Sequence, residues 1–184
     1  MAITDKLTEI ANAIRSKNGT TNTMTLDEMS NAITNIQTGM ITSDNRCTTI
    51  PDYLFYGCEK LALTELPSGV TSIGISAFEN CPNLAITELP SGVTSIGDSA
   101  FSGCAKLALT ELPSGITSIG HGAFENCTGI HSLTFKGTPN TIAPIAFIGC
   151  DNLTTINVPW AEGAVENAPW GATNATINYN YVAV

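Results

Sequence analysis

Charged side chains are scarce in this 184-residue sequence, and positive ones most of all. Charged residues make up 12% of the chain, about half the usual share. Only 7 residues are Lys or Arg, against 16 Asp or Glu, which gives a formal net charge of −9 at pH 7. Proteins that bind nucleic acid or anionic membranes need clustered positive charge, and no such cluster is present. We therefore expect neither nucleic acid nor a membrane among the partners.

Long apolar runs are missing as well. No stretch approaches the length of roughly 18 apolar residues that a membrane helix needs. The first residues, 1–6, lack the basic segment and the apolar run that begin a secretory signal, so we expect no signal peptide. Hydrophobic residues nevertheless make up 43% of the chain, which is typical of a folded protein rather than a disordered one.

The sequence also lacks the usual signatures of catalysis and metal binding. His121 and His131 are the only histidines, and no nucleophile elbow, His-Glu-x-x-His motif or phosphate-binding loop is present. The six cysteines do not form the closely spaced pairs that zinc sites use. We therefore predict that the protein is not an enzyme and that it holds no cofactor and no metal.

What the sequence has instead is an internal repeat of 23 residues. Each unit reads Cys-x-x-Leu-Ala-Leu-Thr-Glu-Leu-Pro-Ser-Gly-Val-Thr-Ser-Ile-Gly-x-x-Ala-Phe-x-x, with small variations. Five cysteines keep this spacing, and a phenylalanine precedes each of them by three residues. The cysteines are Cys58, Cys81, Cys104, Cys127 and Cys150, and the phenylalanines are Phe55, Phe78, Phe101, Phe124 and Phe147.

Such short units cannot bury their apolar side alone, so they must stack and share one continuous core. We predict short β segments around residues 61–66 and 70–73, each paired in parallel with the next unit. Pro67-Ser68-Gly69 and its copies supply a turn. Gly74, Gly97 and Gly120 supply the next corner, and Ala-Phe-x-x-Cys supplies a short helical or 3₁₀ turn. The fold class is therefore a β-rich repeat solenoid of five units, over residues 40–159.

The two ends of the chain differ from the repeat. Residues 1–39 show two amphipathic helical patterns, and Thr25-Leu26-Asp27-Glu28 is a capping box at the start of the second. This segment is predicted to be an α-helical hairpin that caps the solenoid, attaches it to a partner or forms oligomers. Residues 160–184 are predicted to be a cap, with Trp160 and Trp170 over the open end and a strand near residues 176–181.

The repeat unit resembles the BspA-type (Treponema-type) leucine-rich repeats, over about 60% of the chain. The terminal segments, around residues 7–33 and 158–172, resemble tail-associated structural proteins of phages and prophages of Gram-positive bacteria. These resemblances imply a non-enzymatic virion component, tail-associated or fibre-like, assembled in the host cytoplasm. Its helices would bind other virion proteins or further copies in a homo-oligomer, and its solenoid would bind a host surface protein or glycan. The alternative is a BspA-like adhesin or protein-interaction module on a bacterial surface.

Candidate binding residues are those that vary while the repeat frame stays constant, because such positions face solvent; neutral drift on an inert face is the competing explanation. They are Asp98 and His121 in one register, Glu79, Ser102 and Glu125 in a second, and Lys106 beside the cysteine.

Two repeated rows carry reactive groups. Glu65, Glu88 and Glu111 form an acidic row, which is either a solvated edge or a weak cation site. The cysteine row is interpreted as buried free thiols, with a disulfide or a metal as the alternatives. Cys47 lies outside the register.

Overall fold

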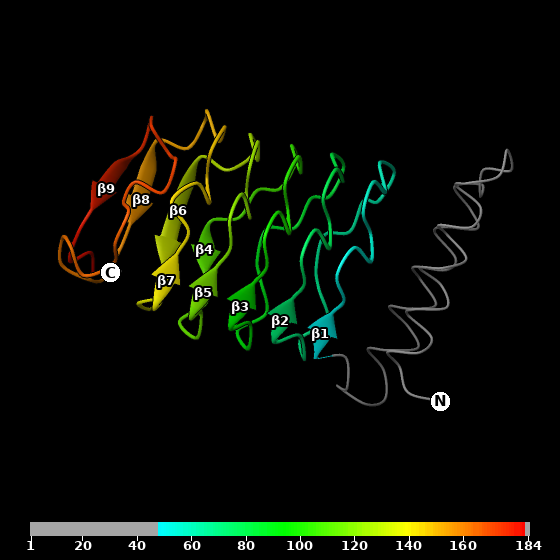
Figure 1. The fold of residues 1–184 in the computed structure, drawn as a ribbon, viewed down its shortest axis with the longest axis horizontal. Coiled ribbons are helices and arrows are strands. Elements are labelled where there is room, and N and C mark those ends of the chain that lie inside the picture. The colour runs from blue at the N-terminus through cyan, green and yellow to red at the C-terminus, as the bar shows by residue number, and fades with distance from the viewer. Residues whose placement is uncertain (1–47, 183–184) are drawn as a thin grey trace, which may run out of the picture.

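A computed structural model describes residues 48–182, which wind into a solenoid of stacked coils (Figure 1). The predicted helical hairpin of residues 1–39 and Cys47 lie outside the described residues. Phenylalanine recurs once in each of the first five coils, at the register of Phe55, and all five copies are buried. Trp170 takes this register in a sixth coil.

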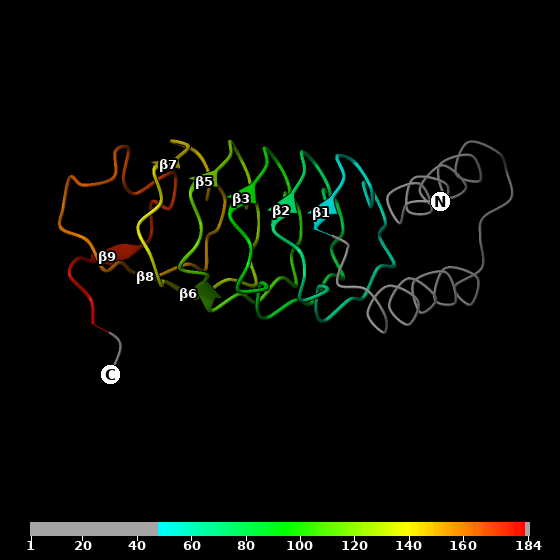
Figure 2. The same ribbon diagram turned by 90° about the horizontal axis from the view of Figure 1, so that it is seen from below.

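Two parallel sheets lie on opposite sides of the coils (Figure 2). In the first, which we call sheet A, each strand pairs with the same residues of the next coil, 23 residues on. Its strands are β1 (Thr49–Ile50), β2 (Ser72–Ile73), β3 (Ser95–Ile96), β5 (Ser118–Ile119) and β7 (Thr141–Ile142). The second, sheet B, contains β4 (Glu111–Leu112), β6 (Ser132–Phe135), β8 (Thr155–Asn157) and β9 (Thr176–Asn178).

The β segment predicted at residues 61–66 forms only in later coils, where its copies are β4, β6 and β8 of sheet B. Among the described residues no strand lies at 61–66 itself, and the stretch instead makes an isolated bond from the Ala85 N–H to the Leu63 carbonyl, 2.9 Å long. Ala and Glu are depleted in strands, and the proline that follows has no N–H to donate. Sheet B forms a four-residue strand only at β6, where Lys136 replaces this proline and its N–H donates to the Leu112 carbonyl at 3.0 Å.

The predicted helical turn at Ala-Phe-x-x-Cys is wrong, although its Phe and Cys are buried as expected. The residue before each cysteine has a positive φ, between 57° and 74°, which a right-handed helix cannot contain. These residues are Gly57, Asn80, Gly103, Asn126 and Gly149. Gly and Asn adopt this conformation most easily. The position before each repeated cysteine, which the repeat pattern writes as a variable x, is therefore always one of these two residues.

In these turns every second backbone N–H donates a hydrogen bond to a carbonyl of the next coil. The Phe78 N–H donates to the Ala100 carbonyl, and the Phe101 N–H donates to the Ala123 carbonyl, both at 2.8 Å. The remaining N–H groups close turns within their own coil. The backbone of the turn is thus satisfied without a helix or a sheet.

The solenoid has six coils where five were predicted, because the predicted cap winds once more. The Phe147 N–H donates to the Trp170 carbonyl at 2.9 Å, and β9 pairs in parallel with β8. Trp170 is fully buried, and Trp160 packs edge-on against Phe135 with ring centroids 5.2 Å apart. Both tryptophans therefore close the end of the core and β9 is a strand, as predicted. The extra coil was missed because it lacks the Cys and Ala that mark the other units.

Candidate functional site

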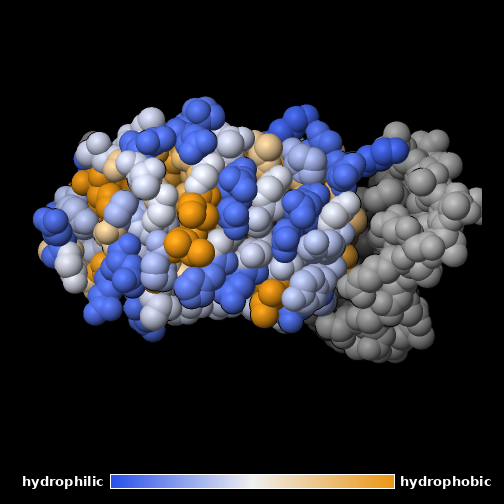
Figure 3. Space-filling model, turned by 45° about the horizontal axis from the view of Figure 1, so that its top comes forward, coloured by the Kyte–Doolittle hydropathy of each residue, from blue (hydrophilic) through white to orange (hydrophobic). Residues whose placement is uncertain are grey.

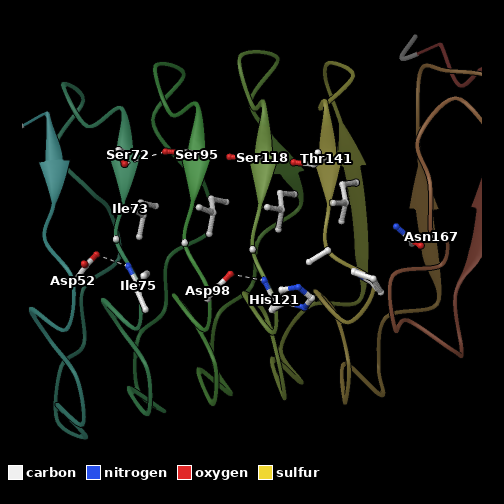
Figure 4. A pocket seen from close by; sticks show the side chains of 18 residues that line it. Asp52, Ser72, Ile73, Ile75, Ser95, Asp98, Ser118, His121, Thr141 and Asn167 are labelled. Atoms are coloured by element: carbon white, nitrogen blue, oxygen red, sulfur yellow. Dashed lines mark hydrogen bonds between the residues drawn. The ribbon is translucent and has the colours of Figure 1, made fainter.

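A groove runs along the outer face of sheet A, across the coils. Its hollow has a volume of about 660 Å³. Two rows of side chains border it (Figure 4). The hydroxyl row consists of Ser72, Ser95, Ser118 and Thr141, and the variable row consists of Asp52, Ile75, Asp98, His121, Pro144 and Asn167. We call the hollow the sheet groove.

The hydroxyl row follows from the alternation of a β-strand. In each strand of sheet A the isoleucine points into the core, so the residue before it must point outward. Ser72, Ser95 and Ser118 are accordingly half-buried, while Thr141 is exposed. The Ser95 hydroxyl lies 3.0 Å from the Ser72 hydroxyl and is hydrogen-bonded to it. The row therefore offers a line of hydroxyl groups spaced one coil apart.

Two carboxylates of the variable row are held in place by the backbone of the next coil. Asp52 Oδ1 accepts the Ile75 N–H at 2.7 Å, and Asp98 Oδ1 accepts the His121 N–H at 2.8 Å. Each carboxylate keeps its second oxygen for another donor. The side chains are exposed, so they present an oriented negative charge to the groove.

Glycines between the two rows allow the coils to approach closely enough for these bonds. A Cβ built on Gly120 would lie 2.6 Å from the Asp98 backbone nitrogen, and one on Gly97 would lie 2.7 Å from that of Ile75. Real Cβ atoms do not come so near to backbone. The predicted corner is therefore confirmed. Glycine is needed there because the previous coil leaves no space for a side chain, and not because the backbone has a positive φ.

The structure separates the predicted binding residues instead of gathering them. Asp98 and His121 line the sheet groove. Glu79, Ser102 and Glu125 lie half-buried on the run of turns, outside the groove. Lys106 is exposed and also lies outside the groove, and its Nζ donates to Asn83 Oδ1 at 2.8 Å. The glutamates Glu65, Glu88 and Glu111 lie on the side of sheet B.

Sequence reasoning missed Asp52, the hydroxyl row and Asn167 as groove residues. Asp52 lies in the register of Asp98, two units earlier, and could have been found by extending the register to the first unit. The hydroxyl row could not be recognised as a lining, because a constant Ser-Ile pair is equally consistent with a purely structural role.

The acidic row does not form a metal site in the described structure. Among residues 48–182, no group of three or more His, Cys, Asp or Glu side chains is placed to hold a metal ion. Glu111 instead pairs with Lys136, with 2.8 Å between Oε1 and Nζ. Both side chains are largely exposed, so the pair adds at most about 1 kcal/mol to stability. This favours the solvated edge over the cation site.

The cysteine row is buried and contains no disulfide, as predicted for Cys58 to Cys150. Thiols of later coils donate to a phenylalanine carbonyl of the coil before, as Cys104 does to Phe78 at 3.1 Å. Burial raises the pKa of the Cys104 thiol to about 12 and that of Cys150 to about 11. These thiols are neutral at physiological pH, and neutral thiols are poor nucleophiles and poor metal ligands.

The outer surface is mostly polar. On the face drawn in Figure 3, the apolar residues form small, separate spots between polar side chains. Within residues 48–182, no helix is long and apolar enough to span a membrane. The sheet groove is a concave feature of this surface that spans several coils.

Three solved structures resemble the chain. A leucine-rich-repeat protein of T. pallidum is 29% identical with a TM-score of 0.55, and the match covers 73% of this chain. It covers 63% of that protein, so the chain spans less than two thirds of its length. A leucine-rich-repeat protein of Bacteroides ovatus is 29% identical, with a TM-score of 0.41. This match covers 60% of this chain and 34% of the Bacteroides protein.

A leucine-rich cell surface protein of Faecalibacterium prausnitzii is 24% identical, with a TM-score of 0.40. This match covers 76% of this chain and 53% of the Faecalibacterium protein. No curated protein matches the sequence. The T. pallidum structure is that of a leucine-rich-repeat protein, so it gives no support to the resemblance of the terminal segments to phage proteins. The segment at residues 158–172 is instead part of the sixth coil, and that at residues 7–33 lies outside the described residues.

A family model settles the classification. The model of the BspA-type leucine-rich-repeat region matches residues 48–167 in six copies, the same number as the coils of the solenoid. The match covers more than half of the chain and includes every strand of sheet A. The chain therefore belongs to the BspA-type leucine-rich-repeat family.

Proposed function

We propose that this protein is a non-enzymatic interaction module at a bacterial surface, and that it binds its partner in the sheet groove. Membership of the BspA-type family supports this reading over that of a virion component, for which residues 48–182 offer no observation. Surface display is part of what the resemblance to BspA-type adhesins implies.

The composition of the variable row carries the proposal. The core positions repeat almost unchanged, whereas the variable row reads Asp, Ile, Asp, His, Pro, Asn from the first coil to the last. A constant frame with a changing row of exposed residues is how solenoids present a recognition surface. This row borders a groove that spans the coils. The identity of its side chains would therefore determine which partner the groove binds.

The groove favours binding over catalysis. A serine nucleophile needs an adjacent base that accepts its proton. The Ser95 hydroxyl is instead hydrogen-bonded to the Ser72 hydroxyl. His121 lies in the variable row, and its backbone rather than its ring is the group that contacts Asp98. This arrangement provides hydrogen-bonding groups for a ligand but no activated nucleophile.

A matched pair of substitutions tests the groove. Thr141→Arg places a long charged side chain in the groove from the exposed end of the hydroxyl row, and Thr87→Arg adds the same group at an exposed position outside it. We expect peptides or glycans selected on arrays with the native protein to bind Thr141→Arg at least tenfold more weakly, with binding to Thr87→Arg unchanged. Circular dichroism would verify that both variants fold. If every selected ligand binds both variants equally, the groove is not the binding surface.

We further propose that residues 1–39 form the attachment or oligomerisation segment. The hairpin predicted from the sequence has more apolar positions than two short helices can bury between themselves, so we expect a further partner, and closed homo-oligomers are the commonest solution. The full chain should then be oligomeric by light scattering, while a chain that begins at Thr42 should be folded and monomeric. A monomeric full-length chain would reduce the segment to a cap of the first coil.

A further inference from the structure

We infer that the partner of the sheet groove is an extended, positively charged peptide segment in a polyproline II conformation, with two basic side chains three residues apart. The inference rests on the groove being the binding surface proposed above, and it names the chemistry of the ligand. Three features of the described residues carry it: the charge of the groove, the spacing of its carboxylates and the groups between and opposite them.

The charge of the groove selects a cationic partner. Asp52 and Asp98 contribute carboxylates to its lining, and none of the residues that line it is Lys or Arg. The whole protein adds to this field, because its formal net charge is −9. Opposite charge increases the rate of association and disfavours acidic competitors.

The spacing of the carboxylates selects the conformation. Asp52 and Asp98 belong to the first and third coils, and neighbouring parallel strands lie almost 5 Å apart, so the two groups are about 10 Å apart along the groove. A polyproline II segment brings residues i and i+3 to the same side at a rise of about 9 Å. In a fully extended β-strand, residues on the same side lie about 7 or 14 Å apart, which fits two coils poorly.

The groups around the carboxylates suit the same ligand. Ile75 lies between Asp52 and Asp98 in the variable row and is 40% exposed, so it can contact the apolar residues between the two basic side chains. The hydroxyl row faces the variable row across the groove (Figure 4). A polyproline II backbone makes no internal hydrogen bonds, so its carbonyl groups remain available to the hydroxyls of the row other than that of Ser95, whose proton is donated to Ser72.

The carboxylates are also preorganised, which lowers the cost of ordering them on binding. Each is fixed through Oδ1 by a backbone N–H of the next coil, 2.7 Å away for Asp52 and 2.8 Å for Asp98. An asparagine at either position keeps a side-chain oxygen for this N–H and removes only the charge. This provides variants that alter recognition without altering the fold.

Fluorescence anisotropy with the full chain tests the inference. The probe is Pro-Pro-Lys-Pro-Pro-Lys-Pro-Pro-amide with a fluorescent dye on its N-terminus, and the comparison peptides carry the same dye and have the two lysines adjacent or replaced by glutamate. We expect the probe to bind most tightly and added salt to weaken it. Asp52→Asn and Asp98→Asn should each weaken it roughly twofold to fivefold, and the double variant roughly tenfold. The charge-matched control Asp151→Asn, at an exposed position outside the groove, should change binding by less than about twofold.

The outcomes separate this inference from the proposed function. Equal binding of the probe by native protein and the double variant, equal binding of all three peptides, or absence of binding would overturn the inference. If neutral glycans or acidic peptides then still bind in a manner sensitive to Thr141→Arg, the groove is a binding surface for another class of partner. If no ligand is sensitive to Thr141→Arg, the proposed function itself fails.

Discussion

Replacing Phe101 by alanine is expected to lower the free energy of unfolding by about 3–5 kcal/mol. Phe101 is completely buried in the middle of the solenoid. Its ring stacks between those of Phe78 and Phe124, with centroids 5.4 and 5.5 Å away. Its loss leaves a cavity with two unpaired ring faces, which the rigid coils on either side cannot close by collapsing.

Thermal melts followed by circular dichroism would measure this loss. For a chain of this size the midpoint should fall by roughly 6–20 °C. Tyr56→Ala is the matched control, because Tyr56 is an aromatic residue of the same turn run but is 51% exposed. Its removal should cost no more than about 1 kcal/mol, because it loses only an edge contact with Tyr53, whose ring centroid is 6.2 Å away. A midpoint for Phe101→Ala equal to that of the native protein would contradict the shared aromatic core.

Stability should also fall steeply between pH 9 and pH 11. Burial raises the pKa of the Cys104 thiol to about 12 and that of Cys150 to about 11, and it raises the pKa of Cys81 and Cys127 as well. In the unfolded chain these thiols ionise near pH 8.5. Above that pH the folded state binds more protons than the unfolded state, so rising pH favours unfolding.

Each such thiol lowers the free energy of unfolding by about 1.4 kcal/mol per pH unit in this window, so four together lower it by about 5–6 kcal/mol per unit. The stabilisation is complete below pH 8.5 and is lost as the pH rises through the folded pKa values. Urea titrations at several pH values, with a reductant present, would measure the slope. Cys104→Ala should remove about a quarter of it. A slope that is the same in Cys104→Ala and native protein would show that the thiols are not the cause.

The sequence alone was sufficient to predict the repeat, its length and its buried positions. Periodicity identifies these features because each unit repeats the same local environment, so Phe78, Phe101 and the cysteines had to lie inside a common core. The turn at Pro-Ser-Gly and the strand at Thr176–Asn178 follow from the conformational preferences of single residues. Such properties depend on neighbours in the chain or on an identical neighbour one unit away.

The tertiary structure alone decided which exposed residues share a surface. Asp52, Asp98 and the hydroxyl row meet in one groove, whereas Glu79, Lys106 and Glu111 face other sides of the same coils. It also decided that Trp170 substitutes for phenylalanine in a sixth coil. A sequence pattern identifies buried positions, but it does not show toward which face an exposed side chain points. The last unit lacks most of the residues that mark the repeat, so only packing shows that its tryptophan occupies the phenylalanine position. The relation between residues on different coils depends on where each turn bends the backbone, which packing determines.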